Sequence, residues 1–196
     1  MTKKLLAIFV ISTTCCAQEP SSLKSGVYEG LSLAISKEGL VTGYFNEKQG
    51  EVVEKGCSFY LQGTYAAGQV NFISWRTSKL PGSLKVQSDG VVLQIPQGRT
   101  HPGCMSVLLP QIDQGLSLDL TSSASWEELR VVASEKASFY KEPDETKKMK
   151  AYLVKGNVVG VVDTKKGWLS VEYLTEKGKF GGWMPESNLA RLEASK

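Results

Sequence analysis

The chain has 196 residues and a formal net charge of +3, from 23 lysines and arginines against 20 aspartates and glutamates. So small an excess of positive charge argues against a nucleic-acid-binding protein, which would present a strongly basic face. After residue 17, no segment approaches the roughly 20 consecutive apolar residues of a membrane-spanning helix, so the sequence does not predict an integral membrane protein.

The N-terminus has the layout of a secretory signal peptide, which we expect to comprise residues 1–17. Lys3 and Lys4 form a short positive region, and the apolar run over residues 5–11 is too short to span a bilayer. Small residues lead to Ala17, where a signal peptidase would cut before Gln18. The mature protein, about 180 residues long and close to neutral, is therefore expected in the periplasm or the extracellular space.

A lipoprotein signal is an alternative interpretation of the same segment, with Cys15 or Cys16 carrying the lipid. The residues at positions 12–14, before Cys15, are Ser, Thr and Thr, and they lack the Leu and the Gly or Ala of the usual lipobox. We therefore prefer a free exported protein and keep lipid anchoring as the alternative.

Residues 18–125 have the pattern of an antiparallel all-β domain. Apolar, β-branched and aromatic residues alternate with polar ones in short runs, and glycine-bearing turns such as SKEG, AAG and SDG separate the runs. Connections this short join antiparallel neighbours, because a parallel crossover needs a dozen or more residues. Seven or eight such strands predict a meander that forms a barrel or a sandwich. The expected strands are GVYEGLSLAI, GLVTGYF, CSFYLQGTY, QVNFISW, SLKV, VVLQI, CMSVLL and LSLDL.

Two cysteines, Cys57 and Cys104, remain in the mature chain. An even pair of cysteines in an oxidising compartment predicts a disulfide bond between them. In the chain-entropy description, closing a loop of that length stabilises the fold by about 4 kcal/mol. His101, the single histidine, lies close to Cys104 in the sequence, so the two could be interpreted as a base and a nucleophile. A disulfide-bonded sulfur cannot attack a substrate, so we expect His101 to be a loop residue instead.

The β pattern breaks at residues 121–125 (TSSAS), which are small and polar and mark the expected domain boundary. Trp126 follows directly and is expected to pack in the seam between the two halves. Residues 124–130 (ASWEELR) are the only segment of the mature sequence that we expect to form a helical turn, and it is too short to be stable alone. Residues 126–196 form the second expected domain.

Short motifs follow one another in the second domain. LVKG occupies residues 153–156, GWLSV residues 167–171 and GWM residues 182–184, and Asn188 and Leu189 close the series. In this order they resemble the bacterial SH3 domain across residues 131–192. The resemblance implies a small barrel with a groove that binds peptides. The expected fold is therefore all-β, with an N-terminal antiparallel meander barrel or sandwich followed by a small C-terminal SH3-like barrel.

The resemblance assigns several aromatic residues and a proline to the ligand groove. Flat amphipathic rings bury much area at low entropic cost and keep a polar edge, so they suit an extended peptide. Trp183 has a competing role, because related domains commonly bury the ring at this position in the core. For Tyr140 and Trp168 the core and the groove are equally open. The candidate groove residues are Tyr140, Pro143, Trp168, Tyr173 and Trp183.

No further arrangement of residues predicts catalysis, a metal site or a cofactor. A zinc site takes about four ligands, more than one histidine and two separated cysteines provide. No glycine-rich phosphate loop follows a strand and opens a helix. The close carboxylate pairs, Glu127-Glu128 and Asp144-Glu145, are adjacent in sequence, as is typical of a solvated surface.

These features predict an exported, non-catalytic envelope protein that binds cell-wall (peptidoglycan) peptides or an envelope protein through its SH3-like module. The alternative function is that of an inhibitor or immunity protein against a cell-wall-degrading (muralytic) enzyme. That alternative predicts a protruding loop, and residues 99–103, with Arg99 and His101 beside the disulfide, are the candidate.

Overall fold

The computed structural model describes residues 22–175 and 178–194, and their regular structure consists of β-strands and short 3₁₀ turns. The all-β prediction is therefore confirmed. The expected signal peptide, with Cys15 and Cys16, lies outside the described residues. The strands of the N-terminal half are β1 (Gly26–Tyr28), β2 (Leu31–Ile35), β3 (Leu40–Gln49), β4 (Lys55–Ala66), β5 (Gln69–Trp75), β6 (Lys79–Val86), β7 (Gly90–Gln94) and β8 (Leu116–Ser123).

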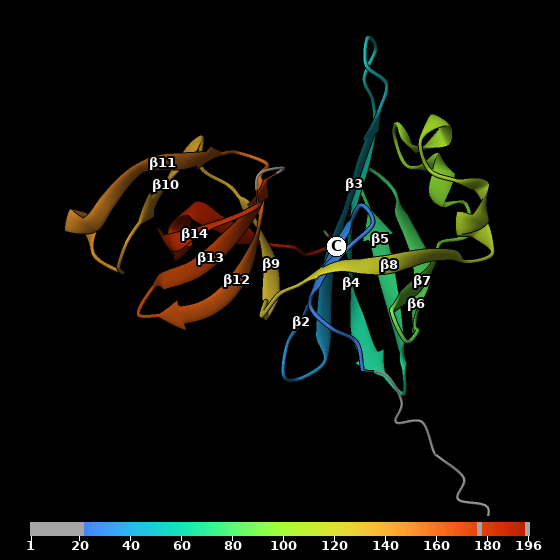
Figure 1. Ribbon diagram of the computed structural model, residues 1–196, viewed down its shortest axis with the longest axis horizontal. Helices are drawn as coiled ribbons and strands as arrows, with labels where there is room; N and C mark the ends of the chain where they lie inside the picture. The colour runs from blue at the N-terminus through green and yellow to red at the C-terminus, as the bar shows by residue number, and fades with distance from the viewer. Residues whose placement is uncertain (1–21, 176–177, 195–196) are drawn as a thin grey trace, which may run out of the picture.

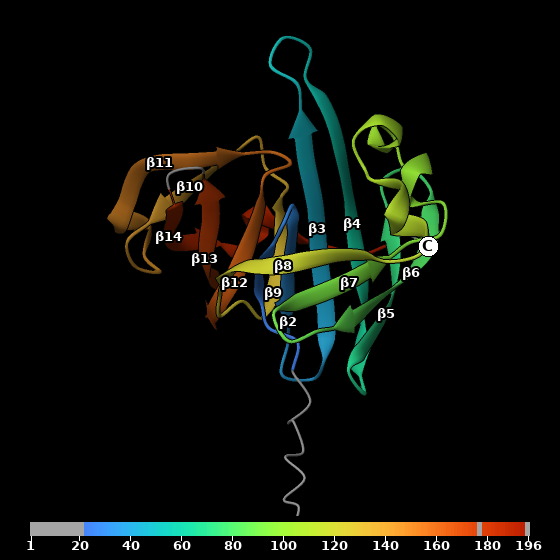
Figure 2. The same cartoon turned by 45° about the vertical axis from the view of Figure 1, so that its right-hand side comes forward.

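Strands β1 to β8 form a closed antiparallel barrel, in which each strand pairs with its sequence neighbours and β8 pairs with β1 (Figures 1 and 2). Tight turns impose this order. Between β4 and β5, Ala67 and Gly68 both have positive φ, at 50° and 80°, which is the backbone twist that a two-residue hairpin turn requires. Of the two arrangements that the sequence predicts, the barrel is formed.

Side chains fill the barrel interior. Phe45 of β3 and Phe59 of β4 are opposite each other in register and stack with ring centroids 4.9 Å apart. Leu33 and Leu61 are fully buried on either side of Gly43, where a Cβ atom would come within 2.8 Å of both leucines. Glycine at this position therefore lets neighbouring strands carry large residues into one packed core.

The connection from β7 to β8 contains three 3₁₀ turns, η1 (Gly98–Thr100), η2 (Cys104–Ser106) and η3 (Pro110–Asp113). The prediction of a strand at residues 104–109 is therefore wrong. In the closed barrel β7 already pairs with β6 and β8, so this segment has no free strand edge to join. Its apolar residues instead pack into the barrel core: Cys104, Val107, Leu108 and Ile112.

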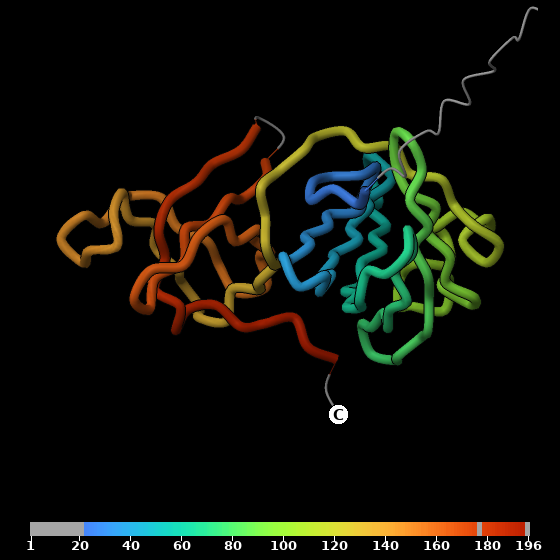
Figure 3. Tube along the Cα trace, turned by 90° about the horizontal axis from the view of Figure 1, so that it is seen from below, coloured from blue at the N-terminus to red at the C-terminus, as the bar shows by residue number. Residues whose placement is uncertain are grey.

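The C-terminal half forms a second, curled antiparallel sheet beside the barrel (Figures 1 and 3). Its strand order is β11-β10-β14-β13-β12-β9-β15. Valines of β12 and residues of β13 and β14, such as Val161, Leu169 and Met184, fill its concave core. The strands are β9 (Glu128–Val132), β10 (Lys136–Tyr140), β11 (Lys148–Val154), β12 (Val158–Lys165), β13 (Trp168–Thr175), β14 (Gly178–Pro185) and β15 (Leu189–Arg191), with the 3₁₀ turns η4 (Glu145–Lys147) and η5 (Glu186–Asn188).

Helical structure in residues 22–175 and 178–194 is limited to the 3₁₀ turns. The helical turn expected at residues 124–130 is not formed, because residues from Glu128 onward pair with both β12 and β15 as strand β9. Two-sided strand pairing outweighs the weak helical preference of a short segment. Over the same described residues, no helix has the length and apolar character needed to cross a membrane.

Trp126 packs in the seam between the barrel and the second sheet, as the sequence predicts, and is 2% exposed. It clusters with Ala34 of β2, Leu129 of β9 and Leu192, which follows β15. Figure 3 shows the segment after β15 running back towards the barrel. Gly160 of β12 makes room for the indole, because a Cβ atom there would overlap the ring. The two halves therefore share a small apolar core.

Hydrogen bonds across the seam fix the two halves to each other. Ser25 Oγ of the N-terminal half donates to the Trp126 carbonyl at 2.6 Å, and the Trp126 indole is itself held within the C-terminal half, where its Nε1 donates to Glu172 Oε2 of β13 at 2.8 Å. The Leu129 amide donates to Thr42 Oγ1 of β3 at 2.8 Å. These bonds are directional, so they set the orientation of the two sheets as well as their contact.

Candidate functional site

Aromatic side chains gather on the outer face of the second sheet. The rings of Tyr140 and Trp168 meet edge to face with centroids 4.8 Å apart. Trp183 is opposite Tyr140 on one side and Ser170 on the other, and Pro185 is opposite Trp168. Opposite residues of antiparallel strands share a face of the sheet. We call Tyr140, Trp168, Trp183 and Pro185 the aromatic patch.

A tight turn places Trp168 at the edge of this patch. Lys166 and Gly167, between β12 and β13, both have positive φ, at 48° and 81°, so Trp168 is the first residue of the new strand. The Gly167 carbonyl accepts a 2.8 Å hydrogen bond from the amide of Glu186 in η5. This bond holds the start of β13 against the segment that follows Pro185, so the patch is a rigid surface.

The residues of the aromatic patch differ in how far they are exposed to solvent. Tyr140 is only 6% exposed, whereas Trp168, Trp183 and Pro185 are half-buried. The Tyr140 hydroxyl donates to Glu145 Oε2 at 3.5 Å. Burial, and secondly the nearby Glu145 carboxylate, raise the pKa of Tyr140, so the hydroxyl stays protonated at neutral pH. The patch thus offers apolar ring faces next to a carboxylate.

The loop between β10 and β11 borders the patch with charges of both signs. Asp144 caps η4, accepting from the Thr146 amide at 2.8 Å, and this bond holds the pKa of Asp144 below its usual range. Lys141 and Lys147 are exposed in the same loop. The patch is therefore bordered on this side by both carboxylate and ammonium groups.

The structure separates the five predicted groove residues. Tyr140, Trp168 and Trp183 come together, and Pro143 lies half-buried in the adjoining β10–β11 loop. Tyr173 is not part of the patch: it alternates with Glu172 along β13, so it packs against the sheet core on the opposite face.

Of the two roles that the sequence leaves open for Trp183, the structure favours the exposed face over the core. The next residue, Met184, is fully buried in the core, and strand alternation turns the Trp183 ring to the outer face. Sequence reasoning missed Pro185, since its place beside Trp168 depends on the pairing register of β13 and β14. The sequence did contain one signal for Pro185, which is its position two residues after Trp183.

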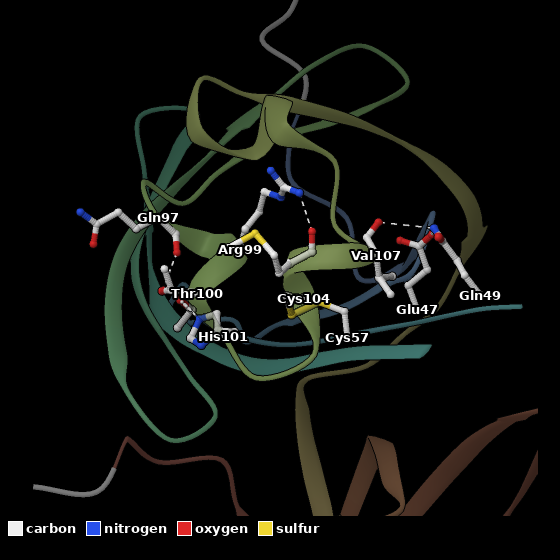
Figure 4. The surroundings of a disulfide bond; sticks show 11 residues. Glu47, Gln49, Cys57, Gln97, Arg99, Thr100, His101, Cys104 and Val107 are labelled. Carbon is white, nitrogen blue, oxygen red and sulfur yellow. Dashed lines mark hydrogen bonds between the residues drawn. A yellow bond between two sulfur atoms is a disulfide. The ribbon is translucent and has the colours of Figure 1, made fainter. Parts of the chain in front are cut away.

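The predicted disulfide between Cys57 and Cys104 is formed and ties η2 to strand β4 (Figure 4). His101 precedes it and is 2% exposed, with its ring stacked on Phe59 and Nε2 at 3.0 Å from Ser74 Oγ. Burial lowers the pKa of His101, which favours the neutral ring. The histidine therefore helps to close the barrel end.

The expected protruding loop at residues 99–103 is consequently wrong. Arg99 donates through Nη2 to the carbonyl of Met105, so its side chain lies along the 3₁₀ segment (Figure 4). His101 is buried beneath it. The disulfide and the buried apolar residues of this segment hold it against the barrel end. A short loop without these contacts would be free to project into the solvent.

The segment that protrudes is the β3–β4 hairpin, which extends beyond the barrel (Figures 1 and 2). Val52 and Val53 at its tip are 96% and 71% exposed. A salt bridge of 2.7 Å between Lys48 and Glu54 joins the two strands below the tip. The hairpin therefore presents two adjacent apolar side chains with no packing role in the barrel.

In residues 22–175 and 178–194, no group of three His, Cys, Asp or Glu side chains is arranged to hold a metal ion. Comparisons with protein-family models, curated proteins and solved structures found no match to the chain. Geometry and residue chemistry are therefore the basis for a functional assignment.

Proposed function

We propose that the protein is an exported, non-catalytic binding protein that holds an extended peptide on the aromatic patch. The observation that carries this proposal is the rigid grouping of Tyr140, Trp168 and Trp183, with Pro185, on one outer face of the sheet. Partly exposed tryptophan and tyrosine are the residues that most often anchor binding partners. The SH3-like motif order supports a peptide as the ligand.

The disulfide and the small net charge narrow the class of ligand. A disulfide such as Cys57–Cys104 persists in an oxidising, exported environment. The near balance of charge gives no attraction for nucleic acid. A cell-wall peptide or a segment of an envelope protein is therefore the proposed ligand. The burial of His101 and the oxidation of Cys104 support binding without catalysis, because neither group is free to react.

Replacing Trp168 with alanine is expected to weaken binding to purified peptidoglycan at least roughly tenfold, because an accessible aromatic anchor is removed. Co-sedimentation of the protein with insoluble peptidoglycan, over a range of protein concentrations, measures the affinity. Synthetic stem peptides added as competitors show whether the peptide portion is recognised.

Tyr152→Ala is the matched control, because Tyr152 is also an exposed aromatic of this sheet but lies on β11, where its ring contacts Lys136. It should bind as the wild type does. Equal binding by the wild type and Trp168→Ala would contradict the proposal, as would a wild-type protein that stays in the supernatant.

Inhibition of a cell-wall-degrading enzyme is a second candidate function, and the exposed tip of the β3–β4 hairpin favours it. Val52 and Val53 could enter an apolar cleft in such an enzyme, and Glu51 beside them would favour a basic rim. The disulfide at the base of β4 keeps the hairpin rigid, which lowers the entropic cost of binding.

If this second function is correct, the wild type will inhibit one member of a panel comprising a muramidase, an amidase and an endopeptidase. Val52→Ser/Val53→Ser should then raise the inhibition constant roughly tenfold or more, because the apolar contact is lost. Leu40→Ser, at the start of β3, is the control for loss of an exposed apolar residue. Undiminished inhibition by the double variant, or no inhibition by the wild type, would rule the function out.

A further inference from the structure

A cleft of about 270 Å³ lies between the barrel and the second sheet, apart from the aromatic patch. Strands β2 and β3 form one wall, and the β11–β12 turn with strand β13 forms the other. Clefts between domains are preferred sites for small ligands. The polar and aromatic residues that line it are Ser32, Tyr44, Asn46, Asn157, Glu172 and Tyr173.

The floor of the cleft is apolar and rigid. Trp126, Val158 and Leu174 line it, and all three belong to the apolar cluster in the seam. The bond from the Trp126 indole to Glu172 crosses the floor at 2.8 Å. The shape of the cleft therefore depends on both halves of the protein and on the hydrogen bonds that orient them.

The cleft is close to electrically neutral. Glu172 is the single charged residue among the described residues that line it. Its Oε2 accepts from Trp126 at 2.8 Å and lies 3.9 Å from Lys179 Nζ, which balances the charge. An anionic ligand would meet no free cation here, and a cationic ligand would compete with Lys179. A lipid chain would leave the polar rim unpaired.

Hydrogen-bonding groups on the rim remain free for a ligand. In the part of the chain that the structure describes, the side chains of Ser32, Asn46 and Tyr173 have no hydrogen-bond partner in the protein. Tyr44 is held in place by stacking on Tyr60, with ring centroids 5.1 Å apart. Fixed aromatic rings beside hydroxyl and amide groups complement a molecule that has apolar C–H faces and a rim of hydroxyls.

We infer that this cleft binds a neutral sugar unit. The half-buried rings of Tyr44 and Tyr173 contact the C–H faces of the sugar, and Ser32, Asn46 and Asn157 bind its hydroxyl or acetamido groups. The volume suits a ligand at the small end of the usual range for pockets. The inference does not depend on the aromatic patch, since the two surfaces share no residue.

Isotope-labelled full-length mature protein, titrated with chitotriose and separately with maltotriose, tests the inference by NMR. The Trp126 indole N–H lies on the floor of the cleft, so its signal reports occupancy directly. At millimolar concentration, one of the two sugars should shift this signal together with backbone amides of β3 and β13. The absence of such shifts with both sugars would overturn the inference.

Asn46→Ala/Tyr173→Phe removes two rim groups and keeps the packing of the Tyr173 ring. Sugar affinity should fall roughly tenfold, with the thermal unfolding temperature close to that of the wild type. Ser32→Ala is a second variant should the double variant prove unstable. Trp168→Ala should bind the sugar normally, which separates this inference from the peptide proposal. Unchanged affinity in both rim variants would place the sugar elsewhere and overturn the inference.

Discussion

Replacing Trp126 with alanine is expected to lower the free energy of unfolding by about 3–5 kcal/mol, the cost of removing a large buried aromatic side chain. Trp126 is 2% exposed, packs against both halves of the protein and supplies the bond to Glu172. Its loss leaves a cavity over Gly160 and removes the indole hydrogen bond from the Glu172 carboxylate. Urea unfolding followed by far-UV circular dichroism measures the change.

The form of the transition is informative as well. The wild type should unfold in one step, whereas Trp126→Ala should show the barrel and the second sheet unfolding separately, because their shared core is lost. Trp126→Phe is the matched control: it keeps a buried ring and loses the indole donor, so a decrease of only about 1 kcal/mol is expected. A wild-type unfolding curve for Trp126→Ala would contradict a shared core.

The second large effect concerns the disulfide. The double variant Cys57→Ala/Cys104→Ala is expected to lose about 4 kcal/mol of unfolding free energy, because the unfolded chain is no longer cross-linked across 47 residues. Alanine avoids burying a hydroxyl at two fully buried positions. Chemical denaturation of the two proteins under oxidising conditions gives the difference.

Reduction provides an internal control for this variant. A thiol reductant should destabilise the wild type by a similar amount and leave the alanine variant unchanged, because the variant has no bond to reduce. Proteolysis under native conditions should also begin in the β7–β8 connection, since η2 is tied to β4 through Cys104. Equal stability of the oxidised wild type and the variant would show that packing alone holds this connection.

Local patterns identified most of the strands and their antiparallel order. Alternation of apolar and polar residues, with turn residues such as Ala67 and Gly68 between the runs, is visible in short windows of sequence. The exception is the apolar run at residues 104–109, which packs into the core without joining a sheet. A short apolar run has no period that distinguishes a strand from another buried segment.

The candidate binding surfaces were harder to predict. The motif resemblance made Tyr140 and Trp168 groove candidates, with the core equally open to both, and the structure brings their rings into contact. Pro185 was missed because its place beside Trp168 depends on the pairing register of β13 with β14. Tyr173 was grouped with Trp168 although alternation along β13 turns the two side chains to opposite faces of the sheet. His101 was assigned to a candidate protruding loop, yet the disulfide holds its segment against the barrel end and the ring is buried.

The sequence by itself determined the all-β composition and the pairing of Cys57 with Cys104, because strand alternation is a local property and residues 18–196 contain only these two cysteines. Tertiary structure alone decided barrel closure, the outward face of the aromatic patch and the cleft between the halves. These depend on contacts between distant residues, such as the bond from Leu129 to Thr42, 87 positions away. The stability of each of these features is a sum over many pairs of residues that are far apart in the sequence. A short window of neighbouring residues does not contain those pairs.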